Sequence, residues 1–305
     1  MDSKAILDGI ATPQNVKDVP REALDELCAE IRTRLIETIS ETGGHLASNL
    51  GIVELTVALL RCFDPPKDRI VWDVGHQCYV YKMLTGRAQQ MQTLRQMGGI
   101  SGFPNPKESP YDTFVVGHSS TSVSAANGFA KAKKLLAEDD YTIAVIGDGS
   151  LSGGEAYEGL NNAAEAGTNM IIVVNDNQMS IAENHGGLYQ NLKLLRETNG
   201  KAECNFFKSM GFDYVYLNDG NDVEKLIATF KSVKDTKHPV VVHINTLKGH
   251  GYKFAEQDKE TFHWGMPFDL ATGKPKVSYD GENYSDLTAE YLLSEMKKYP
   301  EIVGI

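Results

Sequence analysis

Two polar turns carry the residues of this sequence that are best suited to chemistry. The triplet GDG, centred on Asp148, follows an apolar run at residues 141–146, and the triplet NDN, ending in Asn177, follows a second apolar run at residues 170–174. Helical apolar spacing over residues 153–166 joins these runs into a predicted strand–helix–strand unit, so both turns lie at the carboxyl ends of parallel strands. If the two strands are neighbours, Asp148 and Asn177 come within reach of one ion.

A magnesium ion that carries a diphosphate would fit this pair of turns. Mg²⁺ prefers oxygen ligands and is seldom enclosed by protein, so Asp148 and Asn177 would leave room for phosphate oxygens. The backbone N–H groups of Gly149 and Ser150, at a predicted helix start, would bind the diphosphate. The alternative is an ordinary strand-to-helix turn, whose Gly and Asp only shape the backbone.

Two better-known phosphate motifs are excluded by residue identity. The dinucleotide motif G-x-G-x-x-G would need its third glycine at position 152, where the sequence has Ser152. The P-loop motif G-x-x-x-x-G-K-[ST] does not occur in the chain. Ser152 together with Glu155 instead predicts a capping box at the start of the helix.

Seven longer motifs contain or flank these turns and follow one another along the chain. They are GGHLASNLG from Gly43, WDVGHQCY from Trp72, GHSSTS from Gly117, GDGSLSGG from Gly147, NDNQMSIAEN from Asn175, KGHGY from Lys248 and TFHW from Thr261. In content and in order, from about residue 8 to the C-terminus, they resemble the 1-deoxy-D-xylulose-5-phosphate synthase family of the transketolase superfamily. Plain transketolases share the general plan but match these motifs less well.

The resemblance implies thiamine diphosphate and Mg²⁺ as cofactors, with the cofactor itself carrying the hard chemical step. The implied reaction condenses pyruvate with D-glyceraldehyde 3-phosphate to 1-deoxy-D-xylulose 5-phosphate, with loss of CO₂, for isoprenoid, thiamine and pyridoxal synthesis. One alternative is the N-terminal subunit of a split transketolase. The other is a non-catalytic cofactor-binding subunit, against which the intact Asp148 and Asn177 argue.

Histidines in matching turns extend the predicted site. His45, His76 and His118 each follow a glycine near a predicted helix start, which favours one shared cleft. By resemblance, the residues that act in catalysis and proton transfer are His45, His118 and His263. Those that contact the cofactor are His76, Gly117, His118, Ser119, Gly149, Ser150, Asn177, Lys248 and Tyr252. Those that bind the metal are Asp148, Asn177 and, through its main-chain carbonyl, Met179.

Composition and charge limit the partners and the location. The chain has 305 residues, of which 41% are hydrophobic and 23% charged, and its formal net charge is -11. This acidity disfavours nucleic acid as a partner. The four cysteines lack C-x-x-C spacing, which favours a reduced, intracellular protein. Neither a signal peptide nor a membrane-spanning stretch is recognisable, so we expect a cytoplasmic protein without membrane contact.

Alternating predicted strands and helices indicate an α/β fold, a doubly wound, mostly parallel sheet with helices on both faces. Further strands are expected at residues 69–72, 113–116, 212–217 and 239–245, whereas residues 181–203 are expected to be irregular. Residues 1–275 would form the diphosphate-binding domain. Residues 276–305 would be a linker and the start of a second, pyrimidine-binding domain, with a helix at residues 284–298 and a strand from residue 302.

The implied enzyme is larger than this chain. In the family a second domain supplies the glutamate that activates the aminopyrimidine ring, and a third domain follows it. We therefore expect a longer chain or a partner subunit to supply these domains, and the chain alone to bind the cofactor weakly and turn over little. The resemblance favours a homodimer.

Overall fold

Five parallel strands form the centre of the computed structural model, which describes residues 5–277 and 281–304. In the order β1-β2-β3-β5-β4 they are β1 (Arg69–Trp72), β2 (Thr142–Gly147), β3 (Ile171–Asp176), β5 (Val240–Asn245) and β4 (Asp213–Leu217). Every pairing is parallel. The strands β2 and β3 are neighbours, with Gly147 opposite Asn175, so the two polar turns lie side by side as predicted.

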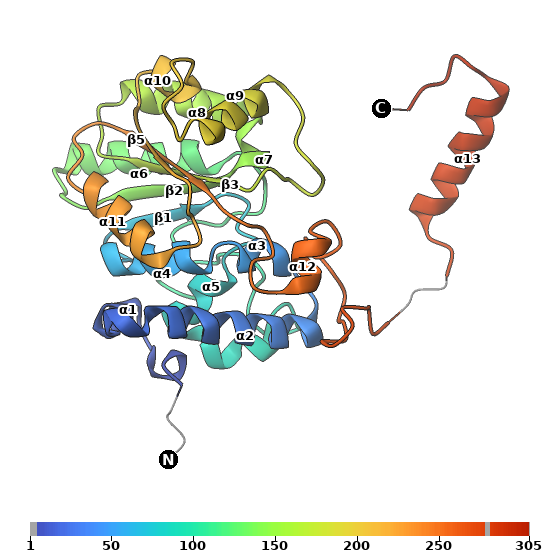
Figure 1. Ribbon diagram of the computed structural model, residues 1–305, viewed down its shortest axis with the longest axis horizontal. Helices are drawn as coiled ribbons and strands as arrows, with labels where there is room; N and C mark the ends of the chain where they lie inside the picture. The colour runs from blue at the N-terminus through green and yellow to red at the C-terminus, as the bar shows by residue number, and fades with distance from the viewer. Residues whose placement is uncertain (1–4, 278–280, 305) are drawn as a thin grey trace.

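Helices cover both faces of this sheet, which explains the nearly continuous apolar runs of β2 and β3. One face packs against α4 (Val53–Cys62) and α11 (Val223–Val233), and the other packs against α6 (Ser122–Leu136) and α8 (Gly154–Glu165) (Figure 1). The long helix α2 (Leu24–Thr42) lies outside α4. The predicted doubly wound α/β fold is confirmed.

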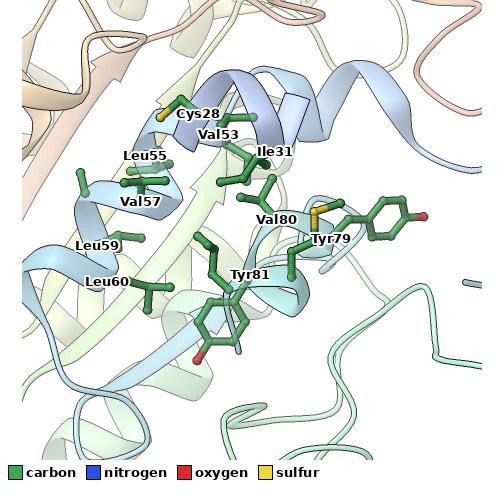
Figure 2. Packing of buried hydrophobic residues seen from close by; sticks show 14 of the residues in the cluster. Cys28, Ile31, Val53, Leu55, Val57, Leu59, Leu60, Tyr79, Val80 and Tyr81 are labelled. Atoms are coloured by element: carbon green, nitrogen blue, oxygen red, sulfur yellow. The ribbon is translucent and has the colours of Figure 1, made fainter. Parts of the chain in front are cut away.

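The largest core lies between α2, α4 and the sheet. Helix α4 is apolar almost all round because it has α2 on one side and the strands on the other. Figure 2 shows its side chains meeting those of α2 and of α5 (Tyr79–Lys82). Each buried leucine or valine here contributes about 1.5–3 kcal/mol. This packing fixes the turns before α3 (Leu46–Leu50) and α5, which carry His45 and His76.

Short helices complete the described chain. They are α1 (Pro13–Asp18), α3 (Leu46–Leu50), α7 (Asp148–Leu151), α9 (Gly187–Glu197), α10 (Phe206–Ser209) and α12 (Lys253–Gln257), with 3-10 turns at Leu7–Gly9, Arg21–Ala23 and Ala88–Thr93 and a π turn at Met83–Arg87. Gly86, at φ 88°, interrupts the helical segment that follows Tyr79. None of the helices in the described ranges is both long and apolar enough to span a bilayer.

Three sequence predictions about these elements are wrong. Residues 113–116 form no strand, because they lie in an extended loop with no neighbouring strand, and Phe114 and Val115 are exposed. The segment 181–203 contains α9, whose Leu192 and Leu195 are buried against the second face of the sheet. The predicted capping box is absent, since α8 begins after Gly153 and the hydroxyl of Ser152 donates to the carbonyl of Gly149.

The C-terminal part is mostly a single exposed helix. Helix α13 (Tyr284–Lys298) has the predicted bounds, contains no buried residue and lies apart from the sheet (Figure 1). Residues 302–304 form no strand, so the strand predicted from residue 302 is not found in the described residues. The boundary near residue 275 remains a prediction, and residues 278–280 of the expected linker lie outside the described ranges.

Candidate functional site

A cleft of about 410 Å³ opens at the carboxyl edge of the strands. This is the edge at which open parallel α/β sheets bind their ligands. The structure brings together at this cleft most of the predicted site residues, namely His45, His76, Gly117, Ser119, Asp148, Gly149, Ser150, Asn177, Met179, Lys248 and His263.

Two predicted site residues lie outside the cleft. The side chain of His118 is exposed, and its Nδ1 lies 2.8 Å from the carbonyl oxygen of Ser119. The ring of Tyr252 packs against three phenylalanines, and its hydroxyl donates to the carbonyl of Leu270. In this chain the turn Gly117–Ser119 therefore borders the cleft through its backbone and Ser119, and neither His118 nor Tyr252 reaches it.

Asp148 has the surroundings of a cation ligand. Its side chain is buried at the end of β2, where Oδ2 accepts a hydrogen bond from Nδ2 of Asn184 at 2.8 Å. Its Oδ1 is also buried but finds no partner within the described ranges. Burial, followed by the nearby charge of Asp176, raises the pKa of Asp148 to about 8. A bound cation would supply what this oxygen lacks and would favour the ionised carboxylate, so the site fits Mg²⁺.

The turn after β3 presents the other predicted metal ligands. Asn177 and Met179 are half-buried and line the cleft beside Asp148. Gln178 between them has φ 68°, and its N–H donates to Oδ1 of Asp176 at 3.1 Å. The N–H of Met179 donates to Oδ1 of Asn177 at 3.2 Å, so the turn is held by its own side chains.

Asp176 is itself fixed by residues to which the sequence gives no role. It is fully buried, it lies 2.9 Å from Nε2 of His243 on β5, and it pairs with Arg196 of α9. The hydroxyl of Tyr214 lies 2.8 Å from the other ring nitrogen of His243. The hydrogen bonds and charges of His243 and Arg196 outweigh burial and hold the pKa of Asp176 below its usual value. The turn that presents Asn177 is therefore anchored to two other elements.

The end of the cleft beside α7 is lined by backbone and by one lysine. Gly149 and Ser150 lie in the first turn of α7, directly after β2. A Cβ on Gly149 would come within 2.8 Å of Cβ of Ser180, so the close approach of these two backbones requires glycine. Lys248 is buried, its Nζ donates to the carbonyl of Ser180 at 2.6 Å, and burial lowers its pKa to about 8. This end can bind an anion through N–H groups and one ammonium.

Three imidazoles form the opposite wall. The ring centroids of His45, His76 and His263 are 5.0, 5.5 and 5.3 Å apart. Burial is the main cause that lowers all three pKa values, to about 3 for His45, to about 4 for His263, and well below the usual value for His76. The charge of Lys248 lowers all three further, and neighbouring imidazoles add to the effect at His45 and His76. The three rings are therefore neutral near pH 7, where each can donate one hydrogen bond and accept another.

Asn49, which the sequence analysis leaves without a role, ties two of these histidines together. Its Nδ2 donates to the carbonyls of His45 and His76, at 2.7 and 2.9 Å, and its Oδ1 accepts from the N–H of Tyr79. It is fully buried. A polar residue inside an apolar helical segment, as in LASNLG, is the signal that could have identified it.

Comparisons with known proteins agree with this arrangement. Residues 7–205 and 194–246 match the family model of 1-deoxy-D-xylulose-5-phosphate synthase. The chain is 43% identical to 1-deoxy-D-xylulose-5-phosphate synthase 1 of Geobacter sulfurreducens, over 98% of this chain and 53% of that protein. It is 45% identical to the Desulforudis audaxviator synthase, over 88% of this chain and 48% of that protein. The chain thus spans about half the length of these curated relatives.

Solved structures of transketolases share this fold. That of Campylobacter jejuni aligns with a TM-score of 0.68 at 19% identity, over 92% of this chain and 48% of that one. That of Leishmania mexicana aligns with a TM-score of 0.66 at 21% identity, over 91% and 48%. At these identities the likeness establishes the fold alone. The family model and the curated relatives show that this chain belongs to the 1-deoxy-D-xylulose-5-phosphate synthase family.

Proposed function

We propose that this chain is the diphosphate-binding part of a thiamine diphosphate- and Mg²⁺-dependent enzyme. That enzyme condenses pyruvate with D-glyceraldehyde 3-phosphate to 1-deoxy-D-xylulose 5-phosphate and releases CO₂. Two observations support the assignment. The chain belongs to the synthase family, and Asp148 has a buried carboxylate oxygen without a hydrogen-bond partner in the described ranges. Because the chain spans about half the length of its relatives, the complete activity requires domains besides those described.

Different residues of the chain would bind the metal ion and the diphosphate. Asp148 would bind Mg²⁺ through Oδ1, with the amide oxygen of Asn177 and the main-chain carbonyl of Met179 beside it. The N–H groups of Gly149 and Ser150 would bind the diphosphate. Thiamine diphosphate, when bound, supplies a nucleophilic carbon that can attack a carbonyl group.

The imidazoles of His45 and His263 would carry out proton transfer. His45 and His263 line the cleft as neutral rings, so each can hold a proton at one nitrogen and accept one at the other. His76 would orient the cofactor through the side of its ring that faces the cleft. Lys248 would balance negative charge near the diphosphate, since its ammonium already lies against the carbonyl of Ser180.

The proposal includes the organisation of the complete protein. Residues 1–275 would be the diphosphate-binding domain, and residues 276–305 would lead into a pyrimidine-binding domain that completes the site. We expect a cytoplasmic homodimer. A transketolase-type enzyme is the competing assignment, and the two are separated by whether the complete enzyme consumes pyruvate and releases CO₂.

Oδ1 of Asp148, which is buried and has no hydrogen-bond partner among the residues that the structure describes, carries the proposal and directs its test. Calorimetric titration of the purified chain with thiamine diphosphate should show binding that requires Mg²⁺. Asp148→Asn keeps the side-chain volume but removes the charge, and it should weaken this binding at least about tenfold. Asp139→Asn, which changes an exposed acid, is the matched control. Equal Mg²⁺-dependent binding by both variants would contradict the assignment of the metal site.

A further inference from the structure

An aromatic side chain that carries no assigned role faces the histidine wall. Phe103 belongs to the loop between residues 98 and 112, lines the cleft and is half-buried. Its ring centroid lies 6.3 Å from that of His45, in an edge-on arrangement. Around it the cleft is lined mainly by imidazoles, two carboxylates, amides, hydroxyls and an ammonium, and its other apolar side chains are Val74, Met179 and Ile181. A phenyl ring placed among such groups can serve an apolar part of a ligand.

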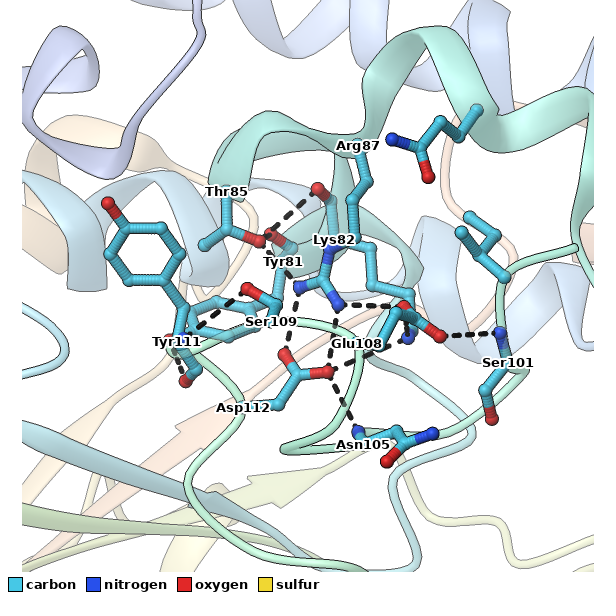
Figure 3. Close-up of polar contacts among 12 residues, drawn as sticks. Tyr81, Lys82, Thr85, Arg87, Ser101, Asn105, Glu108, Ser109, Tyr111 and Asp112 are labelled. Carbon is cyan, nitrogen blue, oxygen red and sulfur yellow. Dashed lines mark hydrogen bonds and ion pairs between the residues drawn. The ribbon is translucent and has the colours of Figure 1, made fainter.

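A buried cluster of four charges holds this loop, and it lies outside the cleft. Figure 3 shows Lys82 and Arg87 of the α5 segment facing Glu108 and Asp112 of the loop. Arg87 binds both oxygens of Asp112 at 2.8 Å, and Lys82 Nζ lies 2.5 Å from Oε1 of Glu108. The side chains of Lys82 and Asp112 are 0% and 1% exposed. Removing such charges from water costs free energy, so a gain in stability alone does not explain why the cluster is buried.

The remaining contacts of the cluster give that reason. Oε2 of Glu108 accepts the N–H of Ser101 at 2.8 Å, and Oδ2 of Asp112 accepts the N–H of Asn105 at 2.8 Å (Figure 3). These two amides stand two residues before and two residues after Phe103. The charged cluster therefore fixes the backbone on both sides of this one side chain.

Pro104, which follows Phe103, holds the loop against the turn after β1. Pro104 is buried, and its Cδ would lie 2.5 Å from a Cβ at Gly75, so the loop packs directly on the backbone of the turn after β1. Gly75 has φ 88°, which favours glycine for a second reason. His76 follows Gly75 in the same turn, so the loop packs against the segment that carries one of the three histidines.

We infer that Phe103 is a selectivity residue that favours a methyl-bearing 2-oxo acid over its hydroxymethyl analogue. The inference rests on the proposed function, in which a two-carbon unit is taken from such an acid beside His45. A methyl group can pack on the phenyl ring, whereas a hydroxyl group packed on that ring would lose water and gain no hydrogen bond from the ring. Glu108 and Asp112, which do not touch the ligand, are positioning residues for this wall.

The positioning is tested on the cofactor-free chain by NMR. Phe103→Leu removes the ring current and should shift the imidazole proton resonances of His45. Asp112→Asn keeps the shape but weakens the cluster, so it should move the same resonances in the same direction and speed amide exchange at Ser101 and Asn105. Unchanged His45 resonances in Asp112→Asn, with the chain still folded, would overturn the positioning role.

The selectivity is tested on the chain assembled with the remaining half that its relatives carry. The measured quantity is the ratio of kcat/KM for pyruvate to that for 3-hydroxypyruvate. Phe103→Asn should lower this ratio on the order of tenfold, whereas Phe103→Leu, which keeps an apolar wall, should retain most of it. A ratio unchanged in Phe103→Asn would overturn the selectivity.

The outcomes separate this inference from the proposed function. A wild-type assembly that is inactive on pyruvate contradicts the proposed function, and the selectivity assigned to Phe103 falls with it. In that case the His45 resonances still decide whether the charged cluster positions Phe103. An active wild type whose preference does not depend on position 103 contradicts the selectivity alone.

Discussion

Substituting His45 should make the chain less sensitive to acid. The folded pKa of His45 is about 3, against 6.5 for an unperturbed histidine, because burial and the neighbouring His263 disfavour the imidazolium. Between these two values the unfolded chain binds a proton that the folded chain does not. Stability that depends on neutral His45 is therefore fully present above pH 6.5 and is lost as the pH falls towards 3.

The size of the effect follows from the shift. At pH 5.0 the unfolded chain gains about 2 kcal/mol from protonating this one residue, since each pH unit below 6.5 is worth about 1.4 kcal/mol. The ring is half-buried, and water at the cleft screens part of this difference. We therefore expect His45 to account for about 1–2 kcal/mol of the stability lost between pH 7.5 and pH 5.0.

Urea unfolding at the two pH values measures this quantity. The wild-type chain should lose about 1–2 kcal/mol more than His45→Gln on going from pH 7.5 to pH 5.0. His118→Gln, which removes an exposed imidazole outside the group of three cleft histidines, is the matched control. Equal losses in the wild type and His45→Gln would refute the reasoning, as would an NMR titration that finds His45 ionising near pH 6.5 in the folded chain.

Two substitutions test the packing of the cleft and of its support. Gly149→Ala should cost about 1–3 kcal/mol in urea unfolding and weaken diphosphate binding, because its Cβ would meet Ser180 at 2.8 Å. The control Gly154→Ala, whose Cβ would have nothing within 4 Å, should be neutral or slightly stabilising. A larger loss of stability in Gly154→Ala than in Gly149→Ala would contradict the predicted clash. Arg87→Leu should cost about 3–5 kcal/mol in thermal or urea unfolding because it leaves the buried Asp112 without its bidentate partner. A loss below about 1 kcal/mol would show that the cluster relaxes or admits water.

The metal end of the site could be predicted because it depends on local order along the chain. A strand, a GDG turn, a helix, a second strand and an NDN turn place Asp148 beside Asn177 whenever the two strands are adjacent and parallel, and they are. The same logic predicts all five strands almost to their ends. It fails for residues 113–116, where a short β-branched run has no neighbouring strand and lies exposed.

The segment after the NDN turn shows why polar sequence can hide structure. Helix α9 contributes only Leu192 and Leu195 to the core, so its composition resembles that of a loop. Its position depends on the pairing of Arg196 with Asp176, which joins residues 20 positions apart. His243, without a role in the sequence, completes the same pairing from β5.

The sequence by itself determined the sheet, the helices that cover its faces apart from α9, the family and the edge at which the site lies, because hydrophobic period and turn chemistry act locally. Tertiary structure alone decided which side chains face the cleft. It brings His263 within 5.5 Å of His45, turns His118 and Tyr252 away, and places Phe103 opposite the histidines. Side-chain direction depends on packing between segments far apart in the chain, and no local pattern encodes that packing.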